Sequence, residues 1–337
     1  MAATLLRRFG AAFALLAATT VVVVVTVPAG PASADPEGGT KTLRDALESA
    51  AKGHIEATAK LAASQKRQKA LQMTLAQAQS SAKALEGQVA VIAARSYRLG
   101  RFNTMSMLLN SSSPDTFLER ALRLDMMAQL DAQTLTRYRN EVTLAQRAKQ
   151  AIDLEIKEQQ KQVTVLAKKK KQAEAALASV GGGSVAGGFI SVNSPLAKPA
   201  PRNPDGSWPH ESCTVDDPTT SGCITPRLLH AYQQARAAGF RHYTSCYSRR
   251  ASGEHPKGRA CDFSANATTF KNVAATGSDK AYGDRLAAFL VKNADRLGVM
   301  YVIWYRQIWM PGTGWRRYSA SGGPAAVHTN HVHLSVL

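Results

Sequence analysis

The residue types with the clearest chemical meaning lie in two motifs of the last third of the chain. His255-Pro-Lys-Gly-Arg-Ala-Cys-Asp262 places a histidine and a carboxylate seven positions apart, and His331-Val-His333 follows near the end. A catalytic zinc ion takes three nitrogen or oxygen ligands and keeps one position open for water. Few structural needs call for this combination, so the motifs predict a zinc-dependent hydrolase.

The local structure expected around these residues favours a metal centre. His331 and His333 fall in a predicted final strand, 331–336, where alternate side chains share one face. Asp262 falls in a predicted strand near 260–263 among apolar neighbours, where a charge is unfavourable unless it is paired or bound to a metal. His255 occupies the loop before that strand.

These strands belong to a predicted α+β domain with an antiparallel sheet over residues 210–337. Apolar periodicity predicts helices at 226–238 and 279–297 and further strands at 240–247, 300–305 and 307–309.

All four cysteines lie in this domain, which predicts two disulfides in an oxidising compartment. Of the alternative pairings, we favour Cys213 with Cys223 and Cys246 with Cys261. Metal binding by the thiols is the weaker alternative, because the chain has no CxxC pair.

The N-terminus has the pattern of an export signal. Arg7 and Arg8 precede an apolar run over residues 10–27, and Ala32-Ser-Ala34 forms a small-residue cleavage site. We therefore expect a signal peptide over residues 1–34 and an exported protein. The alternative is an uncleaved membrane anchor through residues 10–27, since that run is long enough to span a bilayer.

Residues 38–180 predict an all-α antiparallel coiled-coil hairpin. Seam positions recur with 4,3 spacing from Leu43 to Ile92 and again from Leu124 to Leu177. Gly100 and the helix start at Ser113-Pro-Asp115 predict a helical tip at about 100–120. Its Met and Leu residues either form a partner-binding surface or pack against one another. A Gly- and Pro-rich stretch over 181–209 predicts a flexible linker.

The formal net charge of +18 favours a polyanionic partner. For an exported protein this means anionic wall polymers or lipids, and nucleic acid is not an expected partner. The basic run at residues 168–171 falls in a predicted helix, where a solvated face explains it.

The C-terminal motifs resemble the superfamily of lysostaphin-type zinc peptidases, D-Ala-D-Ala metallopeptidases and the hedgehog domain. His255-x-x-Gly-x-Ala-x-Asp262 is similar to the core motif of VanY-like D,D-carboxypeptidases. The run from Ser245 through Tyr301-Val-Ile-Trp304 to His333 resembles an actinobacterial branch of this group. The resemblance implies a hedgehog/D-Ala-D-Ala-peptidase-like fold and activity on peptidoglycan.

Carried over by motif, the resemblance makes His255, Asp262 and His333 the zinc ligands and places His331 beside the zinc-bound water. Arg249 or Arg250 would then hold a substrate carboxylate. The carboxypeptidase branch has a glutamate base before its last histidine, where this chain has Asn330. Three alternatives follow: His331 alone serves as base, Glu254 assists, or the domain binds zinc and cell wall without cutting.

The hairpin carries a second resemblance. Residues 94–102 and 107–120 are similar to the middle of the coiled-coil domain found in several bacterial peptidoglycan hydrolases. In that group the coiled coil is engaged by an FtsEX-type membrane complex that controls the hydrolase, so the resemblance implies such a partner at the coiled-coil tip.

Together these features predict an exported cell-wall metallopeptidase, a D,D-carboxypeptidase or endopeptidase on stem peptides, controlled by its coiled coil. The first alternative is a non-catalytic envelope scaffold with a degenerate, wall-binding peptidase domain. The second, which requires an uncleaved signal, is a membrane-anchored spacer.

Overall fold

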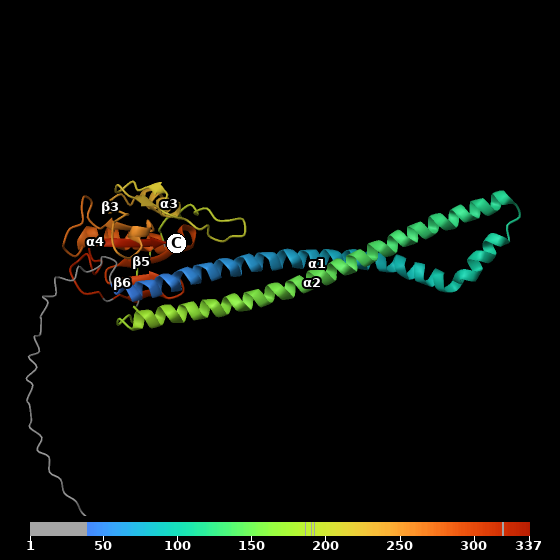
Figure 1. Ribbon diagram of the computed structural model, residues 1–337, viewed down its shortest axis with the longest axis horizontal. Helices are drawn as coiled ribbons and strands as arrows, with labels where there is room; N and C mark the ends of the chain where they lie inside the picture. The colour runs from blue at the N-terminus through green and yellow to red at the C-terminus, as the bar shows by residue number, and fades with distance from the viewer. Residues whose placement is uncertain (1–38, 186, 190, 192, 319) are drawn as a thin grey trace, which may run out of the picture. The chain divides into compact units, whose positions relative to one another are not determined.

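A computed structural model describes residues 39–185, 187–189, 191, 193–318 and 320–337 (Figure 1). The predicted signal peptide at 1–34, with the alternative anchor at 10–27, lies outside the described residues. Among the helices that are described, none combines the length and the hydropathy needed to cross a bilayer.

Two long helices form the first part of the described chain. α1 (Lys41–Leu109) and α2 (Pro114–Ala178) lie side by side and run antiparallel (Figure 1). Polar pairs link them along their length: Glu155 accepts hydrogen bonds from Ser64 at 2.6 Å and from Arg67 at 2.6 Å, and Gln159 donates to Gln68. The expected packing of two long N-terminal helices, as in a coiled coil, is confirmed.

The helix ends follow from local sequence. Thr40 caps α1 by accepting a hydrogen bond from the Leu43 N–H, and Ser113 caps α2 in a capping box with Thr116. Gly100 adopts φ 54° and kinks α1, which then continues to Leu109.

The second part is a small antiparallel-sheet domain, also as expected. Its six-stranded sheet has the order β3-β4-β8-β5-β6-β7, and every neighbouring pair is antiparallel. The strands are β3 (Thr244–Ser245), β4 (Ala260–Ser264), β5 (Val299–Trp304), β6 (Gln307–Met310), β7 (Gly314–Arg317) and β8 (His331–Val336). A separate hairpin pairs β1 (Val215–Asp216) with β2 (Cys223–Ile224).

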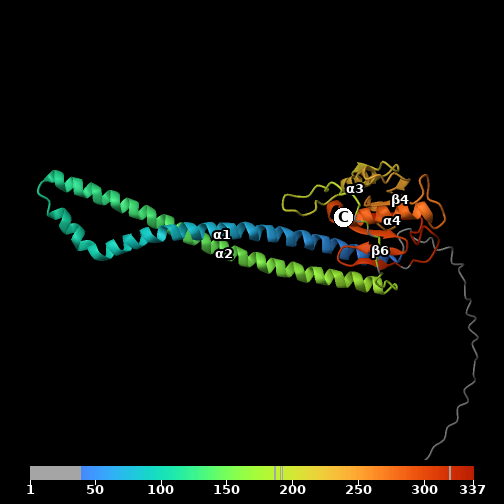
Figure 2. The ribbon, with the colours of Figure 1, turned by 180° about the vertical axis from the view of Figure 1, so that it is seen from behind.

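Helices cover one face of the sheet. α3 (Pro226–Ala237), α4 (Gly277–Lys292) and α5 (Ala294–Leu297) pack on it (Figure 2). The apolar core on this face includes Leu228, Phe289 and Leu297 from the helices and Phe263 and Leu334 from the strands.

The opposite face packs against the long helices. Leu43 and Leu47 of α1 and Leu177 of α2 share an apolar cluster with the β5 residues Tyr301 and Ile303. Side chains alternate between the two faces along β8. Val332 and Leu334 point to the face that α3, α4 and α5 cover, so His331 and His333 point to the opposite face, toward the long helices. The predicted catalytic residue His331 and the predicted metal ligand His333 thus lie on the sheet face that α1 contacts.

The segment predicted to be a flexible linker, 181–209, makes specific contacts with this domain. Ser184 forms an isolated β-bridge with Arg316 of β7, and the Ala197 N–H donates to the Asn293 side chain at 2.8 Å. The Ala200 N–H donates to the Arg296 carbonyl at 2.7 Å. These contacts restrain a stretch whose composition alone predicted a free tether.

The structure contains the two disulfides that the sequence favoured, Cys213–Cys223 and Cys246–Cys261. They indicate that the domain belongs in an oxidising environment outside the cytoplasm.

Candidate metal centre

Three side chains that are distant in sequence converge on one point. The carboxylate of Asp262 lies 2.9 Å from His333 Nδ1 and 3.2 Å from His255 Nε2, and these two nitrogens are 3.3 Å apart. The β4–β8 register produces this arrangement, because Asp262 is paired directly with His333. All three residues are buried, and their candidate ligand atoms lie within 4.8 Å of one another.

His255 reaches the cluster from a short 3₁₀ turn, His255–Lys257, that ends at Gly258. Gly258 adopts φ 67°, and a Cβ there would lie 2.9 Å from the Cys223 carbonyl oxygen. Only glycine fits both the left-handed backbone and the close approach. The turn therefore rests directly on the Cys213–Cys223 loop.

The second nitrogen of each candidate ligand histidine is held by a protein oxygen. His255 Nδ1–H donates to the Cys246 carbonyl, and His333 Nε2–H donates to Ser335 Oγ at 2.7 Å. With these tautomers, His255 Nε2 and His333 Nδ1 present lone pairs to the Asp262 carboxylate. Metal-binding histidines in proteins are held in this way, so the donor set of two imidazoles and one carboxylate fits zinc.

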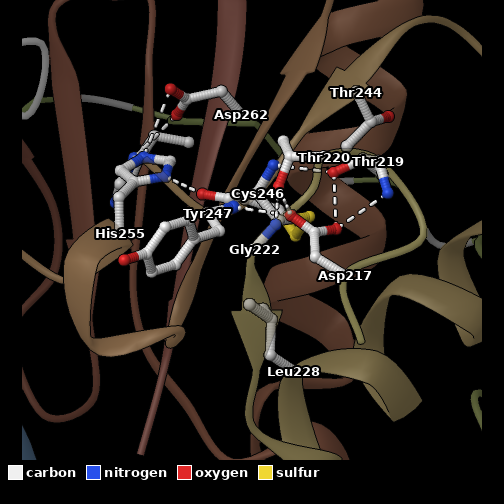
Figure 3. Close-up of a disulfide and its surroundings, with 12 residues drawn as sticks. Asp217, Thr219, Thr220, Gly222, Leu228, Thr244, Cys246, Tyr247, His255 and Asp262 are labelled. Carbon is white, nitrogen blue, oxygen red and sulfur yellow. Dashed lines mark hydrogen bonds and ion pairs between the residues drawn. A yellow bond between two sulfur atoms is a disulfide. The ribbon is translucent and has the colours of Figure 1, made fainter. Parts of the chain in front are cut away.

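The backbone on either side of the Cys246 carbonyl is held by a network of buried and half-buried polar groups (Figure 3). The Cys246 N–H donates to Thr219 Oγ at 2.9 Å, and the Tyr247 N–H donates to Asp217 Oδ2 at 2.8 Å. Buried Asp217 also accepts from the backbone N–H and the hydroxyl of Thr219. The Cys246–Cys261 disulfide joins this network to β4, one residue before Asp262.

His331 lies beside the cluster rather than in it. Its Nε2 is 3.4 Å from Asp262 Oδ1 and makes no hydrogen bond to any described residue. Its Nδ1 lies 2.8 Å from Asn330 Oδ1, while Asn330 Nδ2 donates to the Lys271 carbonyl at 2.7 Å. The amide is therefore oriented so that its oxygen accepts from His331 Nδ1–H, which leaves Nε2 with a lone pair.

Electrostatics give these groups defined charge states. Burial lowers the pKa of His331 to about 4, more than the attraction of Asp262 raises it, so the imidazole is neutral near pH 7. Burial alone would raise the pKa of Asp262, but its electrostatic interactions with the surrounding histidines, His255 foremost, hold it well below its usual range. Asp262 is therefore an anionic candidate ligand.

The other predicted site residues divide between the site and its surroundings. Arg250 Nη2 lies 3.8 Å from Asp262 Oδ2, so this arginine is at the cluster, whereas Arg249 is exposed. Glu254, the alternative base, is buried and forms ion pairs with Lys257 at 3.0 Å and Arg259 at 2.5 Å. These pairs favour a structural role for Glu254.

Two groups of residues at the site were not predicted from the sequence. His328 is fully buried with its ring centroid 4.8 Å from that of His331, and Asn330 and Asp217 hold other site groups. Each lies in a loop, where no periodicity marks which side chains turn inward. The only available signal was three histidines within the six residues 328–333.

Comparison with known proteins adds one similarity. Residues 220–329 match the family described as VldE, C-terminal domain. The matched stretch includes His255, Asp262 and His328 and ends before His331 and His333. No curated protein and no solved structure matches the chain.

Proposed function

We propose that this protein is an exported zinc-dependent peptidase that hydrolyses stem peptides of peptidoglycan, with a coiled coil that controls access to its site. One observation carries the proposal: His255, Asp262 and His333 present three ligand atoms to one point, and His331 stands beside them with a nitrogen that makes no hydrogen bond to a described residue. A coordination set with an adjacent proton acceptor is the arrangement that metal-assisted hydrolysis requires.

In this proposal His255 Nε2, Asp262 and His333 Nδ1 hold the zinc ion. When bound, zinc supplies Lewis-acid chemistry, lowering the pKa of water and polarising a carbonyl group. The protein contributes the fixed orientation of the ligands through the Cys246 carbonyl and the Ser335 hydroxyl.

His331 Nε2 moves the proton. Hydrolysis joins the water oxygen to the peptide carbonyl carbon and breaks the carbon–nitrogen bond, and one water proton must reach the leaving amine. His331 Nε2 accepts that proton and later donates it, while Asn330 keeps Nδ1–H in place throughout. In the carboxypeptidase pattern a glutamate transfers this proton. Here His331 would do so, and no glutamate is needed.

Arg250 is the better of the two candidate substrate arginines. It lies beside the cluster, and a guanidinium binds a peptide carboxylate in a planar, bidentate manner. The motif resemblance supports a D,D-carboxypeptidase or endopeptidase with a hedgehog/D-Ala-D-Ala-peptidase-like fold. The net charge of +18 supports binding to anionic wall polymers.

Contacts between α1 and the C-terminal domain support control by the coiled coil. Arg44 donates to Ser252 Oγ at 2.7 Å, close to His255 in sequence, and Glu48 binds Lys257 at 2.8 Å and Arg259 at 2.5 Å. Leu43 shares an apolar cluster with Tyr301, whose ring stacks on His333. Substrate would reach the buried site after the start of α1 moves.

The coiled-coil tip offers a surface for a controlling partner. A hollow of about 840 Å³ lies there, lined by residues that include Met105, Leu108, Leu124 and Met127. Leu109, Leu118 and Leu122 nearby are more than half exposed. Apolar surfaces of this kind mark protein interaction sites, and the hairpin's resemblance makes an FtsEX-type membrane complex the proposed partner.

A non-catalytic envelope scaffold is the second candidate. It is favoured by the ion pairs that Glu254 forms with Lys257 and Arg259. Because of these pairs Glu254 is not available as a base, and His331 would have to accept the proton alone. In this case the domain binds zinc and wall polymer without cutting peptide bonds.

Digestion of purified peptidoglycan, followed by mass analysis of the products, distinguishes the candidates. We expect the zinc-loaded protein to release products of peptide-bond hydrolysis, chelation to stop the reaction, and added zinc to restore it. A protein that binds wall and zinc but releases no new product, even when Glu48→Gln weakens the α1 contact, is a scaffold.

A further inference from the structure

His328 is held in an unusual backbone conformation beside the metal cluster. It is one of three non-glycine residues with positive φ in the described chain, at φ 52°. Its N–H donates to the Ala325 carbonyl at 3.2 Å, and its carbonyl accepts from the Tyr305 N–H at 2.8 Å. A left-handed backbone costs free energy for any residue with a Cβ, and such costs are concentrated at functional sites.

The side chain of His328 is fully buried, yet neither ring nitrogen makes a hydrogen bond to a described residue. Buried polar atoms in proteins nearly always have a partner, because an unsatisfied one is costly. The ring is not in an apolar pocket: its centroid lies 4.8 Å from that of His331 and 5.7 Å from that of His333. The two ring nitrogens of His328, which make no hydrogen bond to a described residue, therefore lie next to His331 and His333, residues of the proposed reaction.

A structural role does not explain this arrangement. A histidine that serves packing is normally satisfied, as His242 is through the Ala265 carbonyl and a stacked Tyr282 ring. A fourth-ligand role does not explain it either, because the described group that can hold a metal comprises His255, Asp262 and His333.

We infer that His328 is a further catalytic residue, whose ring N–H donates a hydrogen bond to the oxyanion that forms when water adds to the substrate carbonyl. This inference rests on the proposed function. A neutral imidazole carries one N–H donor, and donors placed where negative charge develops contribute strongly to catalysis. His331 then moves the proton and His328 binds the oxygen, so the two neighbouring imidazoles have separate tasks. The ligand class is a tetrahedral oxyanion.

The test uses the full-length protein loaded with cobalt in place of zinc, with inorganic phosphate as the tetrahedral probe. His328→Ala should keep its bound cobalt, while phosphate should shift the visible cobalt spectrum only at about tenfold higher concentration. For peptidoglycan cleavage by the zinc form, kcat should fall about 100-fold with little change in KM, as when one oxyanion donor is removed.

Two amide variants keep the test informative if alanine disturbs folding. Asparagine tolerates positive φ and places its amide near the Nδ1 position, and glutamine reaches the Nε2 position. One of His328→Asn and His328→Gln should recover part of both the phosphate response and kcat, which identifies the donating nitrogen. His230→Asn is the matched control, because His230 lies on α3 and binds the Lys198 carbonyl.

Three results would overturn the inference. These are loss of bound cobalt in all three His328 variants, unchanged phosphate affinity and kcat in all three, or a wild-type cobalt spectrum that phosphate does not change. The proposed function fails separately: if the wild type cleaves no peptide bond but its phosphate response requires His328, the oxyanion site stands without the peptidase. If the wild type cleaves and His328 is dispensable, the peptidase stands without this donor.

Discussion

Asn330 determines which nitrogen of His331 can accept a proton. Asn330 donates to the Lys271 carbonyl and accepts from His331 Nδ1–H, so the lone pair of His331 lies on Nε2 near Asp262. A side-chain amide thus does what a carboxylate does in many histidine-dependent enzymes, without adding a second negative charge to the site.

Asn330→Ala should therefore lower kcat without releasing zinc. Loss of the Oδ1 acceptor lets the imidazole adopt the other tautomer, and we expect kcat to fall about 10- to 100-fold. Zinc content by elemental analysis and peptidoglycan cleavage are the two measurements. Asn330→Asp retains an acceptor for Nδ1–H and should keep more activity than alanine; equal losses in both variants would contradict the tautomer argument.

The two histidines of β8 should respond differently to alanine substitution. His333→Ala removes a ligand and should abolish both zinc binding and cleavage. His331→Ala should retain zinc and lose at least about 100-fold in rate, because it removes only the proton acceptor. Calorimetric zinc titration checks the binding. The opposite pattern would show that His331, not His333, is the ligand.

At this scale the sequence selected candidates where a motif or a strand marked them. Motif spacing selected His255 and Asp262, and strand periodicity selected His331 and His333. The structure brings these four residues together. His328 was missed because a left-handed residue breaks any periodic pattern.

Among the elements, the hairpin of β1 and β2 has the least obvious role. Its loop carries Asp217, whose buried carboxylate accepts hydrogen bonds from Thr219, Thr220 and the Tyr247 N–H. Thr219 in turn holds the Cys246 N–H, next to the carbonyl that orients His255. A two-stranded hairpin outside the main sheet thereby positions a candidate metal ligand.

Asp217→Asn should weaken zinc binding by about 10-fold, since removing outer partners of ligand histidines typically costs 10- to 100-fold. The neighbouring Asp216 is exposed, so Asp216→Asn is a matched control that should leave zinc affinity unchanged. Competition with a colorimetric chelator measures both. If the two variants bind zinc equally well, the hairpin does not support the site.

The first turns of α1 form a second positioning element, and their contact is pH-dependent. Burial alone would raise the pKa of Glu48, but its hydrogen bonds to Lys257 and Arg259 lower it to about 2 from an ordinary value of 4.5. A depressed carboxylate pKa stabilises the folded contact above pH 4.5, and that stabilisation is lost as pH falls toward 2.

Glu48→Gln should therefore lower the free energy of unfolding by about 2 kcal/mol near pH 7, the scale of hydrogen bonds to charged groups. The difference from wild type should shrink between pH 4.5 and 2. Chemical denaturation across this pH range measures it. Asp45→Asn is the control, because Asp45 is exposed and forms an ion pair with Lys41 of the same helix; a constant difference at all pH values would contradict the assignment.

The elements themselves were largely predictable. Heptad spacing predicted the two long helices, and the capping signal at Ser113-Pro114 predicted where the second begins. Packing of residues 194–200 against α4 and α5 was not predictable, because it depends on tertiary contacts such as that of Asn293 with Ala197 rather than on the Pro- and Gly-rich composition.

At the scale of the whole molecule, one face of the sheet both carries the candidate site and packs against the coiled coil. His331 and His333 lie on the face that also packs against Leu43 and Leu47. We therefore expect the proposed site and the coiled coil to be coupled, so that a change that separates α1 from the sheet also changes access to the site.

Weakening the α1 contact should consequently raise peptidoglycan cleavage. The double variant Arg44→Ala/Glu48→Gln removes the bonds to Ser252, Lys257 and Arg259. We expect a rate increase of roughly 10-fold, since 1.4 kcal/mol is a factor of ten in an equilibrium. Product release from purified peptidoglycan measures it, with Asp45→Asn as control. A lower rate in the double variant would mean that α1 completes the site instead of covering it.

The Cys246–Cys261 bridge gives the proposed enzyme an order of maturation. The bridge ties the carbonyl that orients His255 to the strand that carries Asp262. If both thiols are reduced, His255 and Asp262, two of the three proposed ligands, lose the covalent link between the segments that position them. We therefore expect zinc loading to follow oxidation of this disulfide, so that the proposed hydrolase would mature only in an oxidising compartment.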